Sequence, residues 1–193
     1  MSKEILINHI KKYIDLTYQE ELMLLEKIIL RKYLKGQFVI QEGDVCRNDS
    51  YVISGCLVTF CVDGSGREHV LNFAIENWWT ADFGSFIKQS PAKYNVKCIE
   101  NTVLAQISHN DYEELFVKIP KLERFLRLLV QKEYVDAENR VIDNFMLTAK
   151  ERYVIFCKRF PEIEQRVPQY LIASYLGITK EFLSKIRKQI KNE

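Results

Sequence analysis

Between residues 38 and 107 the sequence is a succession of short β-prone runs separated by turn residues. Aromatic and β-branched side chains dominate the runs, and DGSG at residues 63–66 is a good hairpin turn between two of them. Many short strands at close, regular spacing are typical of an antiparallel roll or barrel and argue against alternating β–α units. The predicted strands are residues 38–40, 51–53, 56–62, 69–74, 95–99 and 102–107.

The composition is that of an ordinary globular protein. Of the 193 residues, 47% are hydrophobic and 28% are charged. There is no apolar run of about 18 residues, and charges interrupt the first segment, so we expect neither a signal peptide nor a membrane span. We therefore expect a cytoplasmic protein.

The cysteine and histidine spacing gives no sign of a metal centre. The five cysteines form no CxxC pair, and the three histidines lie far apart. Zinc sites and iron–sulfur clusters usually show short ligand spacing, so we expect reduced thiols, no metal and no cofactor. Sites assembled only in three dimensions stay open.

Helix signals flank the strand region. Thr17 and Glu20 have the spacing of a capping box, and the apolar periodicity that follows predicts a helix ending at Gly36. After the strands, Ser108 with Asp111 is expected to cap a short helix.

After Pro120, the 25 residues 121–145 contain neither Gly nor Pro. This stretch predicts one helix of about 37 Å, longer than a small domain needs. The excess favours pairing with a second copy in a dimer over packing on the roll of its own chain. The apolar stripe consists of Leu122, Phe125, Leu126, Leu129, Val130, Val141, Ile142 and Phe145.

The charge balance changes after this helix. Residues 149–193 carry 10 Lys and Arg against 5 Asp and Glu, whereas residues 1–148 carry 18 against 21. Thr148 and Glu151 repeat the capping-box spacing, so we place a domain boundary near residue 147. A basic piece on a mildly acidic body suggests a polyanion-binding module.

Two apolar helical segments meet at Gly177 near the end of the chain. Glycine tolerates the positive φ of a helix C-cap, and Thr179 is a good N-cap for the second helix. In that helix Phe182, Leu183 and Ile186 are predicted to point inward. Two short helices joined by a glycine-containing turn describe a helix-turn-helix.

In a helix-turn-helix the second helix enters the DNA major groove, and its first turns meet the base edges. Lysine suits guanine and glutamate suits cytosine, whereas basic residues further along the helix meet phosphates. The predicted DNA-binding residues are Thr179 at the helix start, Lys180, Glu181, Ser184 and Lys185 at the bases, and Arg187 and Lys188 at the backbone.

From about Leu16 to its end, the chain resembles the Crp/Fnr family of bacterial transcription regulators. KGQFVIQEGDVCRNDSYVISGCL resembles the family's opening β-roll signature, and ERYVIFCKRFPEI with VPQYLIASYLGITKEFLSKIRKQI resembles its DNA-binding part. The resemblance implies an α+β fold with an antiparallel β-roll (double-stranded β-helix or jelly roll) as sensor domain at residues 1–118. A long dimerisation helix at 119–146 and an all-α helix-turn-helix domain at 147–193 complete it.

The resemblance implies a homodimer that binds a pseudo-palindromic operator in double-stranded DNA and is not an enzyme. It places Lys180, Glu181 and Lys185 at the family's base-reading positions, and it admits RNA polymerase as a further partner. The chain is most similar to the short branch typical of Bacteroidetes, which ends just after the recognition helix and lacks the wing.

The effector region departs from the cyclic-nucleotide-binding members of the family. In those members a glutamate holds the ribose and an Arg-Ser pair holds the phosphate. Here Asp82 falls near the glutamate position, and Lys93 and Tyr94 replace the pair, which removes the bidentate fork. On the long helix Ala137 and Glu138 replace a small hydroxyl pair, and a buried glutamate would repel a phosphodiester. We therefore do not expect cyclic AMP to bind.

Aromatic residues are abundant in this region. These residues suit either a pocket for an unknown small apolar or aromatic effector or a roll whose own side chains fill its lumen. Phe83 is one of the candidate pocket residues. Haem held by His69 or a cysteine stays open without positive support. The aromatic residues are Trp78, Trp79, Phe83, Phe86 and Tyr94.

Two other functions stay open. The chain could be a ligand-binding module that acts on a protein partner through its terminal helices. A cupin-like metalloenzyme is less favoured, because that chemistry needs two or three histidines with a carboxylate, and only His69 lies on a predicted strand.

Overall fold

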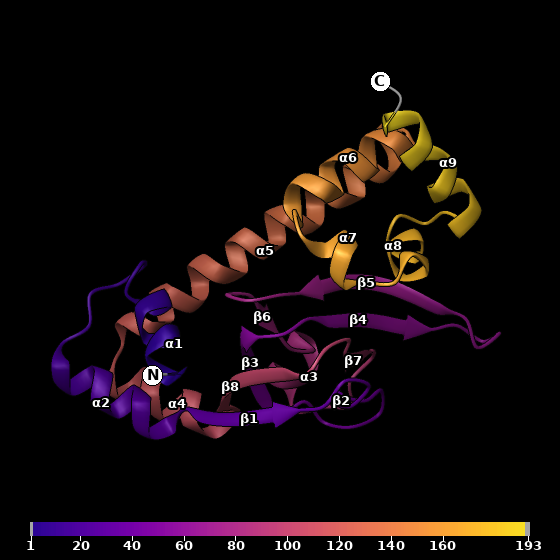
Figure 1. The fold of residues 1–193 in the computed structure, drawn as a ribbon. Helices are drawn as coiled ribbons and strands as arrows, with labels where there is room; N and C mark the ends of the chain where they lie inside the picture. Colours follow the sequence, from indigo (N-terminus) through magenta and orange to yellow (C-terminus); the bar gives the residue numbers. More distant parts are fainter. Residues whose placement is uncertain (1, 192–193) are drawn as a thin grey trace.

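The computed structural model describes residues 2–191, and its centre is a roll of two four-stranded antiparallel sheets (Figure 1). One sheet has the strand order β1-β8-β3-β6 and the other β2-β7-β4-β5. Each predicted strand is found, with its ends shifted by at most a few residues. The strands are β1 (Ile29–Tyr33), β2 (Phe38–Ile40), β3 (Asn48–Ser54), β4 (Leu57–Val62), β5 (Glu68–Ala74), β6 (Trp79–Thr80), β7 (Asn95–Cys98) and β8 (Thr102–Ser108).

The helix predicted to run from Thr17 to Gly36 is wrong in its second half. Helix α2 (Tyr18–Lys27) begins with the predicted capping box, but the chain turns to extended backbone at Ile28, and the next residues form β1. Strand β1 pairs along its whole length with β8, and Leu30 lies opposite Ala105 in this pairing. The β-branched pair at residues 28 and 29 suits a strand, and this long-range pairing overrides the local helical spacing.

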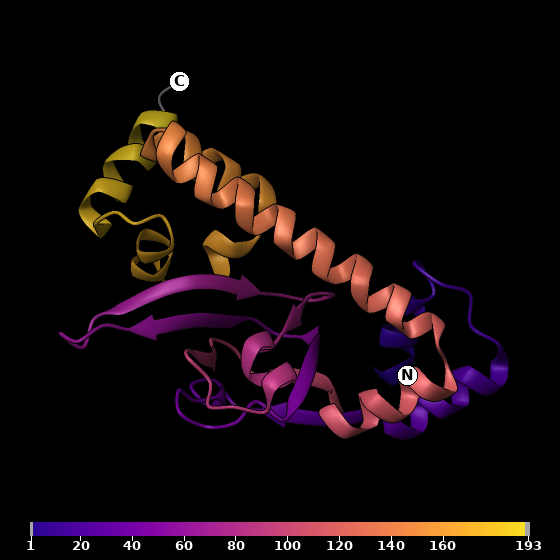
Figure 2. The same cartoon turned by 180° about the vertical axis from the view of Figure 1, so that it is seen from behind.

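Three helices and the start of a fourth cover one end of the roll (Figures 1 and 2). They are α1 (Ser2–Ile10), α2, α4 (His109–Lys118) and the first turns of α5 (Lys121–Met146). Their buried side chains, such as Leu6, Leu24, Leu115 and Phe125, pack in one core with Tyr51 and Leu104 of the roll. A short helix α3 (Phe83–Lys88) follows β6.

Helix α5 is 26 residues long and is buried only at its beginning, at Leu122 and Phe125. It then runs diagonally from the N-terminal helices toward the C-terminal ones, as Figure 2 shows. Its later part carries a set of exposed apolar side chains: Val130, Tyr134, Val135, Val141, Ile142, Phe145 and Met146. No helix within residues 2–191 is long and apolar enough to cross a membrane.

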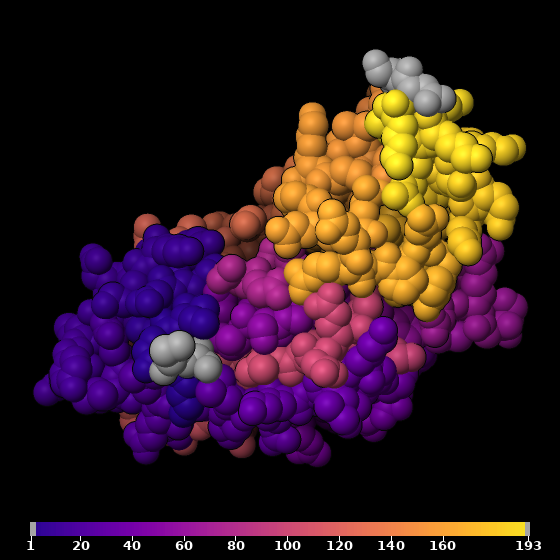
Figure 3. Space-filling model, in the orientation of Figure 1, coloured from indigo at the N-terminus to yellow at the C-terminus, as the bar shows by residue number. Residues whose placement is uncertain are grey.

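The C-terminal helices pack on the outer face of β4 and β5 (Figures 1 and 3). They are α6 (Ala149–Arg159), α7 (Ile163–Arg166), α8 (Gln169–Tyr175) and α9 (Lys180–Lys191). Their apolar side chains form a second core that includes roll residues. The members from the roll are Cys56, Val58, Phe60, Val70, Phe73 and Ile99, and those from the helices include Tyr153, Phe156, Phe160, Ile163, Leu171 and Ile172.

Candidate nucleic-acid interface and effector cavity

Helices α8 and α9 form the predicted helix-turn-helix. Gly177 has φ +68 and ends α8 in a Schellman motif, because its N–H bonds the Ser174 carbonyl while the N–H of Ile178 bonds the Ala173 carbonyl, both at 3.0 Å. The Thr179 hydroxyl then accepts from the Phe182 N–H at 3.2 Å and caps α9. Leu183 and Ile186 are buried against α8, so these bonds set the angle at which α9 leaves the domain.

The outward face of α9 carries nearly all the predicted DNA-binding residues. The side chains of Thr179, Lys180, Glu181, Ser184, Lys185 and Lys188 are exposed. Arg187 differs from them, because it is half-buried and its Nε lies 3.3 Å from Glu164 Oε1. In this conformation Arg187 is therefore held by its own domain.

The prediction that Phe182 points inward is wrong. Phe182 is 48% exposed, whereas Leu183 and Ile186 are 0% and 2% exposed. The inner stripe follows the spacing of residues 183 and 186, and residue 182 lies about 100° away from 183 on the helix. Phe182 therefore lies on the outward side of α9 together with Lys185.

Arg166 joins the helical domain to the roll. Its guanidinium makes two bonds to the Glu76 carboxylate, at 2.8 and 2.9 Å, and two to the Glu100 carboxylate, at 3.0 and 2.8 Å. These charge-assisted bonds to two carboxylates raise the pKa of Arg166 further above its usual range. Because the guanidinium makes two bonds to each carboxylate, the bonds fix the orientation of α7 on the roll as well as its distance from it.

The backbone of edge strand β5 is paired by side chains of the helical part. The Ser174 hydroxyl accepts from the Val70 N–H at 3.0 Å and donates to the Glu68 carbonyl at 3.1 Å. Arg140 of α5 donates to the carbonyls of Leu71 and Val70. The free edge of the sheet is thus covered by α8 and α5, as an exposed strand edge requires.

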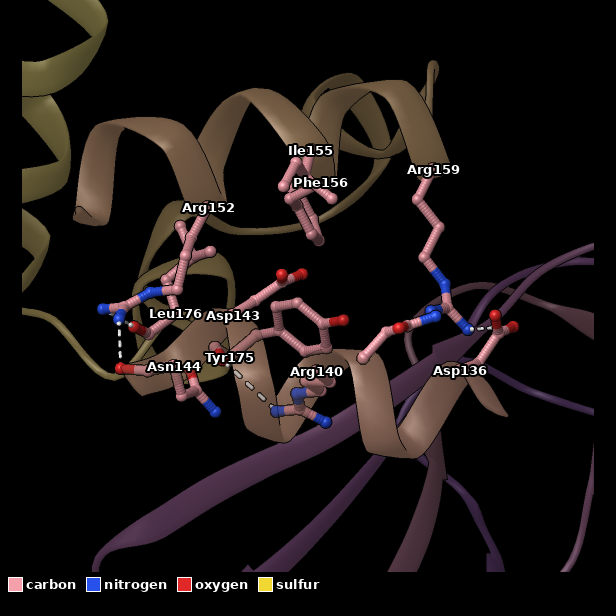
Figure 4. Close-up of a pocket in the computed structure, with 11 residues that line it drawn as sticks. Asp136, Arg140, Asp143, Asn144, Arg152, Ile155, Phe156, Arg159, Tyr175 and Leu176 are labelled. Atoms are coloured by element: carbon pink, nitrogen blue, oxygen red, sulfur yellow. Dashed lines mark hydrogen bonds and ion pairs between the residues drawn. The ribbon is translucent and has the colours of Figure 1, made fainter. Parts of the chain in front are cut away.

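Figure 4 shows the polar cleft, of about 330 Å³, between α5 and the helices α6 and α8. Arg140 lies 4.2 Å from the centre of the Tyr175 ring and donates to the Tyr175 carbonyl, and burial lowers its pKa. Arg152 donates to the Leu176 carbonyl, and Arg159 pairs with Asp136 at 3.1 Å. The cleft arginines therefore bind protein groups that connect the long helix to the helix-turn-helix.

A second cavity, of about 430 Å³, lies between the roll and α5. Of the predicted effector residues, Phe83 and Tyr94 line it. The cavity is lined by Asp49, Thr59, Leu71, Asn72, Phe73, Ala74, Trp79, Thr80, Ala81, Phe83, Tyr94, Leu126, Leu129, Val130, Glu133 and Tyr134.

The other predicted effector residues lie elsewhere. Asp82 is buried, caps α3 by accepting from the Ser85 N–H at 3.0 Å, and accepts from the Lys93 N–H at 2.8 Å. Lys93 has an exposed side chain. Ala137 and Glu138 are exposed too, and Glu138 accepts from the Tyr134 hydroxyl at 2.9 Å. In the single chain Glu138 is therefore exposed and outside the cavity lining, and its burial against a ligand stays a prediction.

Trp78 and Trp79 separate into different sites although they are neighbours. Trp78 stacks on Phe160 of α6, with ring centres 5.2 Å apart, and belongs to the second core. Trp79 lines the cavity and contacts Phe125 of α5, and its indole N–H is buried with no hydrogen-bond partner among residues 2–191. Sequence reasoning grouped the two residues because nothing local distinguishes them.

Comparisons with known proteins agree with this architecture. Residues 30–118 match the model of the cyclic nucleotide-binding domain family. The chain is 25% identical over 180 residues to the transcriptional activator protein Anr of Pseudomonas protegens, covering 86% of this chain and 73% of Anr.

Two solved structures share the fold over most of the chain. The c-di-GMP responsive global regulator CLP of Xanthomonas campestris superposes with a TM-score of 0.72 at 19% identity, covering 91% of this chain and 92% of CLP. FixK2 of Bradyrhizobium japonicum gives a TM-score of 0.73 at 18% identity, covering 86% of this chain and 85% of FixK2.

The roll with its family match defines the class of the protein, a cyclic nucleotide-binding domain joined by a long helix to a helix-turn-helix. The relatives that match across both parts of the chain are transcription regulators, among them Anr, to which this chain is similar at 25% identity. The predicted antiparallel roll and the resemblance to Crp/Fnr regulators are confirmed, whereas the missing wing and the short Bacteroidetes-type branch stay predictions.

Proposed function

We propose that the protein is a homodimer that binds a pseudo-palindromic DNA operator through α9 and regulates transcription there. The observation that carries the proposal is the outward face of α9, where lysines, a glutamate and a serine stand exposed on a well-capped second helix. Phe182 adds an apolar group to this face, suited to the methyl group of thymine.

The exposed face of α5 supports dimerisation. Val130, Tyr134, Ala137 and Val141 follow one another at intervals of four, three and four residues, which is the seam spacing of a coiled coil. The apolar side chains among them are 40–62% exposed in the single chain. A second copy of α5 would bury this seam, and Ala137 would allow the two helices to approach closely.

Changing Val141 to glutamate should dissociate the dimer. The twofold axis brings the two introduced carboxylates close to each other in place of an apolar contact, so we expect the dimer dissociation constant to rise at least about 100-fold. Sedimentation equilibrium measures it. Val117, which is 82% exposed on α4, gives the matched control, Val117→Glu. Equal dissociation of both variants, or of neither, contradicts the seam.

Replacing Lys185 and Lys188 one at a time should separate base recognition from phosphate binding. Lys185→Ala should weaken binding to the operator by about 5- to 150-fold and leave binding to random DNA nearly unchanged. Lys188→Ala should weaken both alike and lower the slope of log affinity against log salt by about one. Fluorescence anisotropy with both DNAs over a salt series measures this, and identical behaviour of the two variants contradicts the assigned roles.

A further inference from the structure

The charged residues that line the cavity between the roll and α5 are both acidic. They are Asp49 of β3 and Glu133 of α5, and no Lys, Arg or His within residues 2–191 lines it. An anion entering the cavity would leave water without meeting a cation, which is costly in a partly apolar site.

Cations near the cavity are directed to other partners. Arg140 lines the cleft beside α6 and α8, and it donates to the carbonyls of Val70, Leu71 and Tyr175. Lys93 meets the site region only through its backbone, whose N–H bonds Asp82. A phosphate group would therefore find no side-chain cation in the lining.

Asp49 has spare hydrogen-bonding capacity. It is 5% exposed, its Oδ1 accepts from the Ser50 N–H at 2.9 Å, and its Oδ2 lies 3.5 Å from the Tyr112 hydroxyl, at the long limit of a hydrogen bond. Burial raises the pKa of Asp49 to about 7. A buried carboxylate with one poorly paired oxygen and no neighbouring cation is a site that a donor or a positive charge would stabilise.

The rest of the lining suits an organic cation. Aromatic side chains come from both sheets and from α5, and rings within about 6 Å of a cation attract it. The volume of about 430 Å³ falls in the usual range for small-molecule pockets. The aromatic residues are Phe73, Trp79, Phe83, Tyr94 and Tyr134.

We infer that this cavity binds a small organic cation, an amine with an apolar or aromatic body, whose charged nitrogen lies at Asp49. The binding itself does not depend on the proposed function. Only the description of the ligand as an effector rests on that proposal. A cyclic nucleotide, or any other anion, is the wrong charge for this lining.

Three phenyl compounds of similar size and different charge test the inference. They are 2-phenylethylamine, 2-phenylethanol and 3-phenylpropanoate, titrated calorimetrically into the full-length chain. We expect the ammonium compound to bind about tenfold tighter than the alcohol, and the carboxylate to bind weakest. Equal or reversed order, or no binding of the amine at about 10 mM, overturns the inference.

Fluorescence locates the binding site independently. Trp78→Phe leaves Trp79 as the one tryptophan, and Trp79 lines the cavity, so the amine should change its emission. Asp49→Asn should reduce amine affinity about tenfold and leave alcohol affinity unchanged, whereas Glu113→Gln, on the exposed side of α4 and outside the cavity lining, should alter neither. Loss of both ligands together in Asp49→Asn, or an unchanged preference for the amine, contradicts the role of Asp49.

The same titrations distinguish this inference from the proposed function. A protein that selects an operator but ignores the amine refutes the inference alone. A protein that binds the amine at Asp49 but selects no DNA sequence refutes the proposed function alone.

Discussion

Replacing Phe160 with alanine should lower the free energy of unfolding by about 3–5 kcal/mol, the range for a fully buried phenylalanine. Phe160 is 0% exposed at the end of α6, and its ring contacts Phe156 within the helical part and both Trp78 and Phe73 of the roll. The cavity left by the ring would therefore weaken the packing of the helical domain on the roll as well as its own core.

Urea unfolding at a fixed protein concentration, followed by circular dichroism and by tryptophan fluorescence, measures the Phe160→Ala effect. Because Trp78 touches Phe160, the fluorescence reports directly on the shared core. Val117→Ala, at a position 82% exposed, is the control and should change stability by less than about 0.5 kcal/mol. A loss below about 1 kcal/mol for Phe160→Ala would contradict a core shared between the two parts.

Asp49→Asn should stabilise the protein at alkaline pH and leave it nearly unchanged at pH 4. Burial raises the pKa of Asp49 from 3.8 to about 7, so between these values the folded state keeps a proton that the unfolded state has lost. The stability of the wild type therefore falls as pH rises through this window, by up to about 4 kcal/mol at about 1.4 kcal/mol per pKa unit. Asparagine does not ionise, so the variant avoids the fall.

The free energy of unfolding of Asp49→Asn and of the wild type should be compared at pH 4 and pH 8. In the difference between the two proteins at each pH, the contributions of the other titrating groups cancel. Asp44→Asn, on an exposed loop, is measured at the same two pH values as the control for replacing one aspartate by asparagine. If Asp49→Asn is no more stable than the wild type at pH 8, Asp49 is ionised and paired in the fold. The account of the cavity charge would then be wrong.

Most of the roll could be predicted from the sequence because its strands are short, rich in β-branched side chains and bounded by turns. The same reasoning failed at β1, where helical spacing continues past Lys27 but pairing with β8 decides the conformation. The brief elements β6, α3 and α7 have too few residues for a periodicity to show.

The helix-turn-helix could also be predicted, because Gly177 and Thr179 are local signals that need no distant partner. The way in which this domain packs on the roll could not be predicted. It depends on pairs such as Arg166 with Glu76, which are 90 residues apart, and no periodicity marks such pairs. Phe182 was misplaced because one residue of rotation on a helix moves a side chain from the core to the surface.

The effector cavity shows the same limit. Phe83 and Tyr94 were identified by their place in an aromatic segment, whereas Asp49 and Glu133 lie on β3 and α5, far from it in sequence. Only the fold brings them to one cavity. The acidic character of the lining could therefore not be predicted from the segment that suggested a pocket.

Selection of DNA from a random duplex pool by the purified protein tests the central proposal most directly. Two α9 helices related by a twofold axis should enrich a pseudo-palindrome whose half-sites lie about one helical turn, roughly 10 base pairs, apart. Enrichment should disappear for Lys180→Ala combined with Lys185→Ala. A confirmed dimer that enriches no sequence would contradict the proposal and would favour a protein partner for the exposed face of α9.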